Sequence, residues 1–122
     1  MPKKILIIED NAKNRTILKD ILSFHKYEVI EAEDGKAGIE LAKQEHPDLI
    51  FMDIQMPVMD GFTAGKILKT MPETKNIKLF ALTSFAMKSD QEKSVEIGFD
   101  DYITKPFELK DLINKIRNAI GQ

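Results

Sequence analysis

Five side chains in the 122-residue sequence suggest a chemistry when they are considered together. Glu9 and Asp10 follow one short apolar run, Asp53 follows another, and Thr83 and Lys105 come shortly after two more. If the fold gathers the three carboxylates, two of them about 5 Å apart would repel by roughly 3 kcal/mol at an effective dielectric near 20. A cation relieves such repulsion, and a ligand set made only of oxygen atoms favours Mg²⁺ or Mn²⁺ over zinc.

The other two groups complete a set that could transfer a phosphoryl group. Thr83 offers a hydroxyl, and Lys105 offers a second positive charge beside the carboxylates and the metal. The bond between Lys105 and Pro106 can take the cis form at modest cost, which would be one way to aim the lysine over the site. Two metal-binding acids, an acceptor carboxylate on Asp53, a hydroxyl and an ammonium suffice for metal-assisted phosphoryl transfer to an aspartate.

Hydrophobic patterning indicates the strands that must position these groups. Short, nearly continuous apolar runs predict strands at 4–8, 27–32, 48–52, 77–82 and 101–103. Strands that are apolar throughout suit a parallel sheet covered on both faces. Their strict alternation with five helical segments predicts an α/β fold, a doubly wound five-stranded parallel sheet of order 2-1-3-4-5. Ligands bind such a sheet at the carboxyl ends of the strands where the winding reverses, here between strands 1 and 3.

The helices are predicted from apolar stripes and end signals. The first and last carry stripes that should face the core, namely Ile17, Leu18, Ile21 and Leu22, and Leu109, Leu112, Ile113, Ile116 and Ile120. The second helix should begin after Asp34, its N-cap, and end before His46. The third should run from about 61 to 71. The fourth should run from about 89 to 97, with a capping box formed by Ser89 and Glu92. His25 and His46 are expected as C-terminal caps or exposed residues, and Asp100 and Asp101 as a solvated corner.

The bulk composition excludes several classes of function. The chain has 18 basic and 20 acidic residues and a net charge of −2, which gives no general attraction for nucleic acid or for an anionic membrane. It contains no cysteine, so disulfides and thiolate chemistry are excluded. The apolar run before Glu9 is too short for a signal peptide or a membrane span. We expect one domain over 1–122 and a cytoplasmic location.

Four stretches resemble a known family along essentially the whole chain. They are residues 7–11 (IIEDN), 49–61 (LIFMDIQMPVMDG), 81–83 (ALT) and 101–107 (DYITKPF). Together and in this order they are similar to the receiver domains of two-component response regulators, whose fold is CheY-like and flavodoxin-like. Because the sequence stops after the last predicted helix, we expect no output domain. The chain would then be either a stand-alone regulator or an excised receiver, and the sequence does not decide between the two.

The resemblance implies a role for each matching residue around the acceptor. Asp53 would be the phosphoacceptor, and it would bind Mg²⁺ together with Glu9, Asp10 and the backbone carbonyl of Gln55, with Mn²⁺ left open. Thr83 would hydrogen-bond the phosphoryl oxygens.

The resemblance also implies a switch and partners. Lys105 would pair with the phosphoryl oxygens, and Tyr102 would be the aromatic that turns inward when Thr83 moves. A histidine kinase or histidine phosphotransfer protein would be the donor, docking on the first helix near 14–22. An unknown protein would read helix 4, strand 5 and helix 5. We expect a monomer, with phosphorylation-dependent dimerisation left open.

Three other functions compete with this interpretation. A phosphohydrolase of the haloacid dehalogenase type needs a second Asp two residues after the nucleophile, where this chain has Gln55, so we do not expect a turnover enzyme. A flavin carrier would not open its phosphate loop with Glu9 and Asp10. A degenerate, phosphate-independent docking module is the best remaining alternative. Phe85 offers nothing to orient an attacking water, which predicts a long-lived aspartyl phosphate.

Overall fold

A five-stranded parallel sheet forms the centre of the protein. The computed structural model describes residues 2–56, 59–84 and 87–121. The strands are β1 (Lys4–Ile8), β2 (Glu28–Ala32), β3 (Leu49–Asp53), β4 (Lys78–Thr83) and β5 (Asp101–Thr104). They pair in the order β2-β1-β3-β4-β5, and every pair is parallel. The predicted fold and strand order are therefore confirmed, with strand ends shifted by a residue at most.

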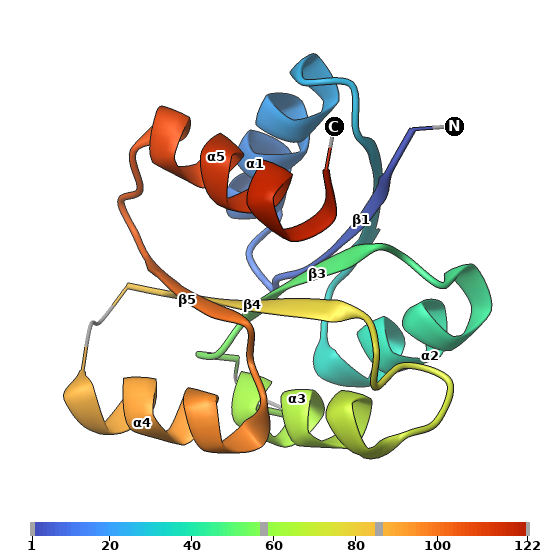
Figure 1. Cartoon of the computed structure of the whole chain (residues 1–122), viewed down its shortest axis with the longest axis vertical. Helices are drawn as coiled ribbons and strands as arrows, with labels where there is room; N and C mark the ends of the chain where they lie inside the picture. The colour runs from blue at the N-terminus through green and yellow to red at the C-terminus, as the bar shows by residue number, and fades with distance from the viewer. Residues whose placement is uncertain (1, 57–58, 85–86, 122) are drawn as a thin grey trace.

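Helices cover both faces of this sheet. They are α1 (Ala12–Phe24), α2 (Gly35–Glu45), α3 (Gly61–Thr70), α4 (Lys88–Ile97) and α5 (Leu109–Ile120). Figure 1 shows α1 and α5 on one side of the sheet and α2, α3 and α4 on the other. Among the helices of the described residues, none combines the length and the apolar character that crossing a bilayer requires.

Two apolar clusters hold the layers together, one on each face. The central strands β1 and β3 are apolar on both faces because both are covered, and Ile5, Leu6, Ile7 and Ile8 are fully buried. Leu18 and Leu22 of α1 pack with Leu112, Ile113 and Ile116 of α5 in one cluster. The other cluster joins α2 and α3 to the opposite face. The rigid centre of the sheet fixes the strand ends that carry the site.

Local signals set several helix ends as predicted. Asp34 is the N-cap of α2, and its carboxylate accepts a hydrogen bond from the Ala37 N–H at 2.8 Å. His25 and His46 are the C-caps of α1 and α2. Asn11 caps α1 by accepting a hydrogen bond from the Asn14 N–H at 3.0 Å, so the first helix begins two residues after Asp10.

The predicted capping box of α4 is wrong, although the bounds of the helix agree with the prediction to within one residue. The helix begins at Lys88, and its N-cap is Met87, whose carbonyl accepts hydrogen bonds from the N–H groups of Asp90 and Gln91 at 3.1 Å. Ser89 therefore lies within the first turn and cannot cap the helix with Glu92. Among the described residues no side chain caps this N-terminus. The helix closes at Gly98, as expected, in a left-handed conformation.

Two other predictions about surface and core need correction. Ile17 and Leu109, assigned to the core stripes, are 49% and 48% exposed, because each lies at the edge of the apolar face of its helix. Asp100 and Asp101 are ion-paired rather than simply solvated. Asp100 accepts hydrogen bonds from the Leu79 N–H at 2.8 Å and the Lys69 ammonium at 3.2 Å. Asp101 pairs with Lys115 at 3.3 Å.

Candidate functional site

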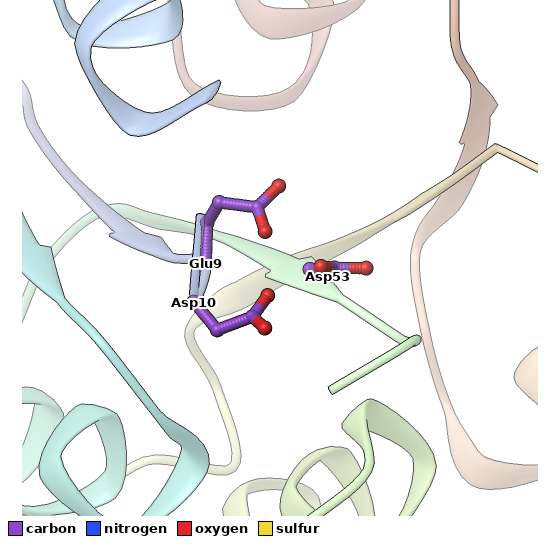
Figure 2. Close-up of side chains that lie close together, drawn as sticks. All are labelled: Glu9, Asp10 and Asp53. Atoms are coloured by element: carbon purple, nitrogen blue, oxygen red, sulfur yellow. The ribbon is translucent and has the colours of Figure 1, made fainter. Parts of the chain in front are cut away.

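Three carboxylates meet at the carboxyl end of the sheet. Glu9 and Asp10 follow β1, and Asp53 is the last residue of β3. The two strands are neighbours, and Ile8 of β1 pairs in register with Met52 of β3. One carboxylate oxygen from each of the three residues lies within 4.8 Å of the others. Figure 2 shows the three side chains close together, with the Glu9 and Asp10 carboxylates on the side that faces Asp53. The structure brings together the three acids that were predicted to share one site.

The three acids differ in burial. Glu9 is 2% exposed and Asp53 is 5% exposed, whereas Asp10 is open to solvent. The Gln55 N–H donates a hydrogen bond to Asp53 Oδ1 at 2.9 Å, and the Asn11 N–H donates to Glu9 Oε2 at 3.3 Å. These backbone donors hold two carboxylates in place and leave oxygen lone pairs for another ligand.

Lys105 reaches the cluster from the loop after β5. Its ammonium donates a hydrogen bond to Glu9 Oε1 at 2.7 Å, and its backbone N–H donates to the carbonyl of Thr83 at 2.6 Å. The peptide bond between Lys105 and Pro106 is cis, one of the forms open to an X-Pro bond. The ammonium therefore lies at the acidic cluster, with Glu9 as its partner in this structure.

The crowded carboxylates have opposite pKa shifts. Burial, together with the neighbouring Glu9 carboxylate, raises the pKa of Asp53 to about 7. Burial acts to raise the pKa of Glu9 too, but the hydrogen bond with Asp53 and the ammonium of Lys105 bring it down to about 2. Without a cation the site thus keeps Glu9 ionised and favours a proton on Asp53. A bound cation would replace that proton.

The donor set fits a hard divalent cation. Each acid supplies an oxygen, the oxygens are close enough to converge on one ion, and exposed Asp10 leaves the site open to water. Mg²⁺ prefers one or two carboxylates and retains several waters, so it does not need an all-protein cage. The residues present are therefore suited to Mg²⁺.

Thr83 and Tyr102 lie on the two strands beyond β3. Thr83 ends β4 and is fully buried, and Tyr102 of β5 is half-buried and paired in register with Ala81. Burial raises the pKa of the Tyr102 phenol, and a hydrogen bond with Thr83 opposes that rise. The two predicted switch residues are thus neighbours. Their movement remains a prediction.

Two contacts at the site were not anticipated from the sequence. The side-chain oxygen of Gln55 accepts a hydrogen bond from the Ser84 N–H at 3.3 Å, which joins the loops after β3 and β4. Arg15 donates a hydrogen bond from Nη1 to the backbone carbonyl of Glu9 at 2.7 Å. An arginine one turn into the helix after two acids was the available signal for the second contact. Phe85, for which a role in phosphate lifetime was predicted, lies outside the described residues.

Comparisons with known proteins agree with this geometry. Residues 5–117 match the family described as the response regulator receiver domain. The polar-differentiation response regulator DivK of Brucella anthropi is 38% identical over 121 residues, which cover 99% of this chain and 98% of DivK. The chain therefore belongs to the response regulator receiver domain family, and it is a receiver domain of two-component signalling.

Solved structures give the same class. The chemotaxis protein CheY4 of Vibrio cholerae superposes with a TM-score of 0.92 at 25% identity, covering 98% of this chain and 99% of CheY4. The receiver domain of the sensor histidine kinase PA1611 from Pseudomonas aeruginosa has a TM-score of 0.91 at 30% identity, with full coverage of both chains. That receiver was crystallised with a magnesium ion coordinated in its active-site cleft. Receiver domains of two-component systems in general have a histidine kinase as partner.

Proposed function

We propose that this receiver accepts a phosphoryl group on Asp53 from a phosphohistidine, with Mg²⁺ bound by Asp53, Asp10, Glu9 and the backbone carbonyl of Gln55. The observation that carries the proposal is the meeting of three carboxylates within 4.8 Å with the Lys105 ammonium at their edge. This arrangement leaves Asp53 as a buried acid beside both negative and positive groups. Mn²⁺ has the same ligand preference and remains an alternative ion.

In the proposed reaction an oxygen of the Asp53 carboxylate attacks the phosphorus of the phosphohistidine. The P–O bond forms as the P–N bond breaks, the electron pair stays on the imidazole nitrogen, and that nitrogen takes up a proton from water. Held by the acidic cluster, a divalent cation would supply positive charge to the phosphoryl oxygens. Lys105 supplies a second positive charge, and the Thr83 hydroxyl donates a hydrogen bond to a phosphoryl oxygen.

The product is proposed to act as a signal rather than as a step in turnover. The haloacid dehalogenase reaction requires a general acid two residues after the acceptor, and the amide of Gln55 does not ionise near neutral pH, so it cannot fill that role. The chain would thus catalyse only its own phosphorylation and slow dephosphorylation. It would act as a monomer, and dimerisation on phosphorylation is the alternative.

The output surface in this proposal is formed by α4, β5 and α5. Among the described residues Ser94 is the buried residue of α4, and no side chain caps the N-terminus of that helix. A helix with so few anchors shifts at low cost when Thr83 and Tyr102 rearrange. A partner protein would read that shift.

Phosphorylation by acetyl phosphate tests the proposal. Wild-type protein with Mg²⁺ should gain one phosphoryl group on Asp53, located by mass spectrometry, and NMR shifts should change around Tyr102. The Asp53→Asn protein should gain none, whereas Asp20→Asn, on the exposed side of α1, should behave as wild type. A label that survives Asp53→Asn would refute the acceptor, and a folded wild type that stays unlabelled would favour the phosphate-independent docking module.

A further inference from the structure

We propose that Arg15 is a positioning residue for the cation site, because it fixes the backbone between Glu9 and Asp10. The inference rests on the Mg²⁺ site of the proposed function. The Arg15 Nη1 group donates a hydrogen bond to the Glu9 carbonyl oxygen at 2.7 Å, although its own helix, α1, begins only after the two acids. The Arg15 side chain is 14% exposed.

With this contact, the N–H, the carbonyl and the carboxylate of Glu9 are all hydrogen-bonded. Its N–H donates to the Ala32 carbonyl of β2 at 3.1 Å, its carboxylate accepts from Lys105, and its carbonyl accepts from Arg15. The Glu9 carbonyl belongs to the peptide plane that carries the Asp10 nitrogen. Holding that carbonyl therefore restricts the direction in which the Asp10 side chain leaves the backbone. Asp10 is solvent-exposed, so packing alone does not restrict it.

Two acids of β2 and the loop after it anchor the guanidinium in turn. Arg15 Nε lies 3.7 Å from Glu31, and Arg15 Nη2 lies 3.9 Å from Glu33. Lys19, one helical turn further along α1, also pairs with Glu31, at 3.4 Å. A planar guanidinium can hold a carbonyl and flanking carboxylates at the same time, whereas a lysine ammonium is a single point charge.

The balance of charge indicates that Arg15 acts through geometry. A lone positive charge behind a cation site would oppose cation binding. Here two basic residues, Arg15 and Lys19, face two acidic residues, Glu31 and Glu33, so the group is electrically neutral. Arg15 can therefore orient the Glu9–Asp10 peptide without a large cost to the affinity for Mg²⁺.

Geometry and charge predict opposite effects of Arg15→Met. Loss of a positive charge alone would strengthen Mg²⁺ binding, whereas loss of positioning would weaken it. Residues that orient metal ligands typically change affinity by about 10- to 100-fold when they are mutated. Because Asp10 is one of several ligands, we expect the lower end, about a tenfold higher Kd. Lys19→Met also removes one positive charge that pairs with Glu31, but it leaves the contact with Glu9 in place. This variant should bind Mg²⁺ within about twofold of wild type or more tightly.

Isothermal titration calorimetry of the phosphate-free protein with MgCl₂, at one pH and ionic strength, gives the Kd of the wild type and of each variant. Urea unfolding in EDTA gives the stability of each variant separately. A merely structural role would lower the unfolding midpoint and leave the Kd of the folded protein unchanged. Arg15→Lys keeps the charge but not the planar fork, so it should fold and still bind Mg²⁺ about threefold more weakly than wild type. It also replaces Arg15→Met as the test if that variant does not fold.

Each outcome decides the proposal. A tenfold weaker Kd for Arg15→Met with an unaffected Lys19→Met supports it. Equal or tighter binding by Arg15→Met, or equal weakening in both variants, overturns it and leaves the proposed function intact. Absence of Mg²⁺ binding in the wild type would instead overturn the cation site, and the role of Arg15 with it.

Discussion

Replacing Asp53 by Asn should make the metal-free protein more stable above neutral pH. Asp53, Glu9 and Asp10 place carboxylate oxygens within 4.8 Å of one another. The Lys105 ammonium pairs with Glu9 at 2.7 Å and so offsets only part of the negative charge. Asparagine keeps the shape of the side chain and an oxygen for the Gln55 N–H, but it removes one of the like charges.

Two calculations give the size of the effect. Two unit charges 4.8 Å apart repel by about 3 kcal/mol at an effective dielectric near 20. The rise in the pKa of Asp53 from 3.8 to about 7 corresponds to roughly 4 kcal/mol as an upper limit. Solvent reaches the site through exposed Asp10 and screens the charges, so we expect a gain of about 2 kcal/mol in the free energy of unfolding.

The gain must depend on pH in a defined direction. Because the folded-state pKa of Asp53 is raised, the folded protein holds this proton more tightly than the unfolded chain. The wild type therefore loses stability as the pH rises from about 4 to about 7, and Asp53→Asn lacks this titration. The advantage of the variant should be about a third as large at pH 5 as at pH 8. Glu9, with its pKa of about 2, stays ionised throughout this range.

Urea unfolding followed by circular dichroism at pH 5 and pH 8, in EDTA and low salt, measures this difference. Asp20→Asn, on the exposed side of α1, controls for loss of a surface charge and should change stability by less than about 0.5 kcal/mol. Added Mg²⁺ should reduce the advantage of Asp53→Asn, since the wild type offers the cation one more carboxylate. The reasoning fails if the variant is no more stable than wild type at pH 8, or if its advantage is independent of pH.

Three further substitutions test packing and ion pairing elsewhere in the fold by thermal unfolding. Gly61→Ala should destabilise the protein by about 2 kcal/mol or more, because the added Cβ would lie 2.4 Å from the Ile54 backbone; an unchanged Tm would contradict this contact. Lys69→Met should cost about 1 to 3 kcal/mol, because it leaves Asp100 without its 3.2 Å partner. Phe24→Gln should change stability by less than about 0.5 kcal/mol, since Phe24 is 79% exposed, and a large loss would show that its ring packs in solution.

The sheet and the acidic cluster were predictable because they depend on strong, short-range signals. Apolar runs such as 4–8 and 48–52 cannot face water on either side, so a doubly covered parallel sheet was the consistent solution. Once the strand order is known, the ends of strands 1 and 3 are neighbours. Asp10 and Asp53 must then approach each other, and the structure confirms that they do.

The details that escaped prediction depend on tertiary contacts. Ser89 and Glu92 form a good local capping pattern, but Met87 is the N-cap of α4, two residues before Ser89, so that pattern cannot act. Asp100 looked like a surface acid, because its partner Lys69 lies 31 residues away in the sequence. Charge balance indicated that Lys105 would join the site, but residue type alone does not indicate that it would bind Glu9.

The small number of buried residues in α4 also affects how the sequence of this helix can change during evolution. Among the described residues of this helix Ser94 is the one that is buried, and the others lie at least partly in solvent. Substitutions at those exposed positions therefore remove little apolar burial from the core. If a partner reads this face, its recognition can be rewritten by drift or by engineering while the acidic cluster and the central strands stay unchanged. Specificity and foldability are then under separate selection.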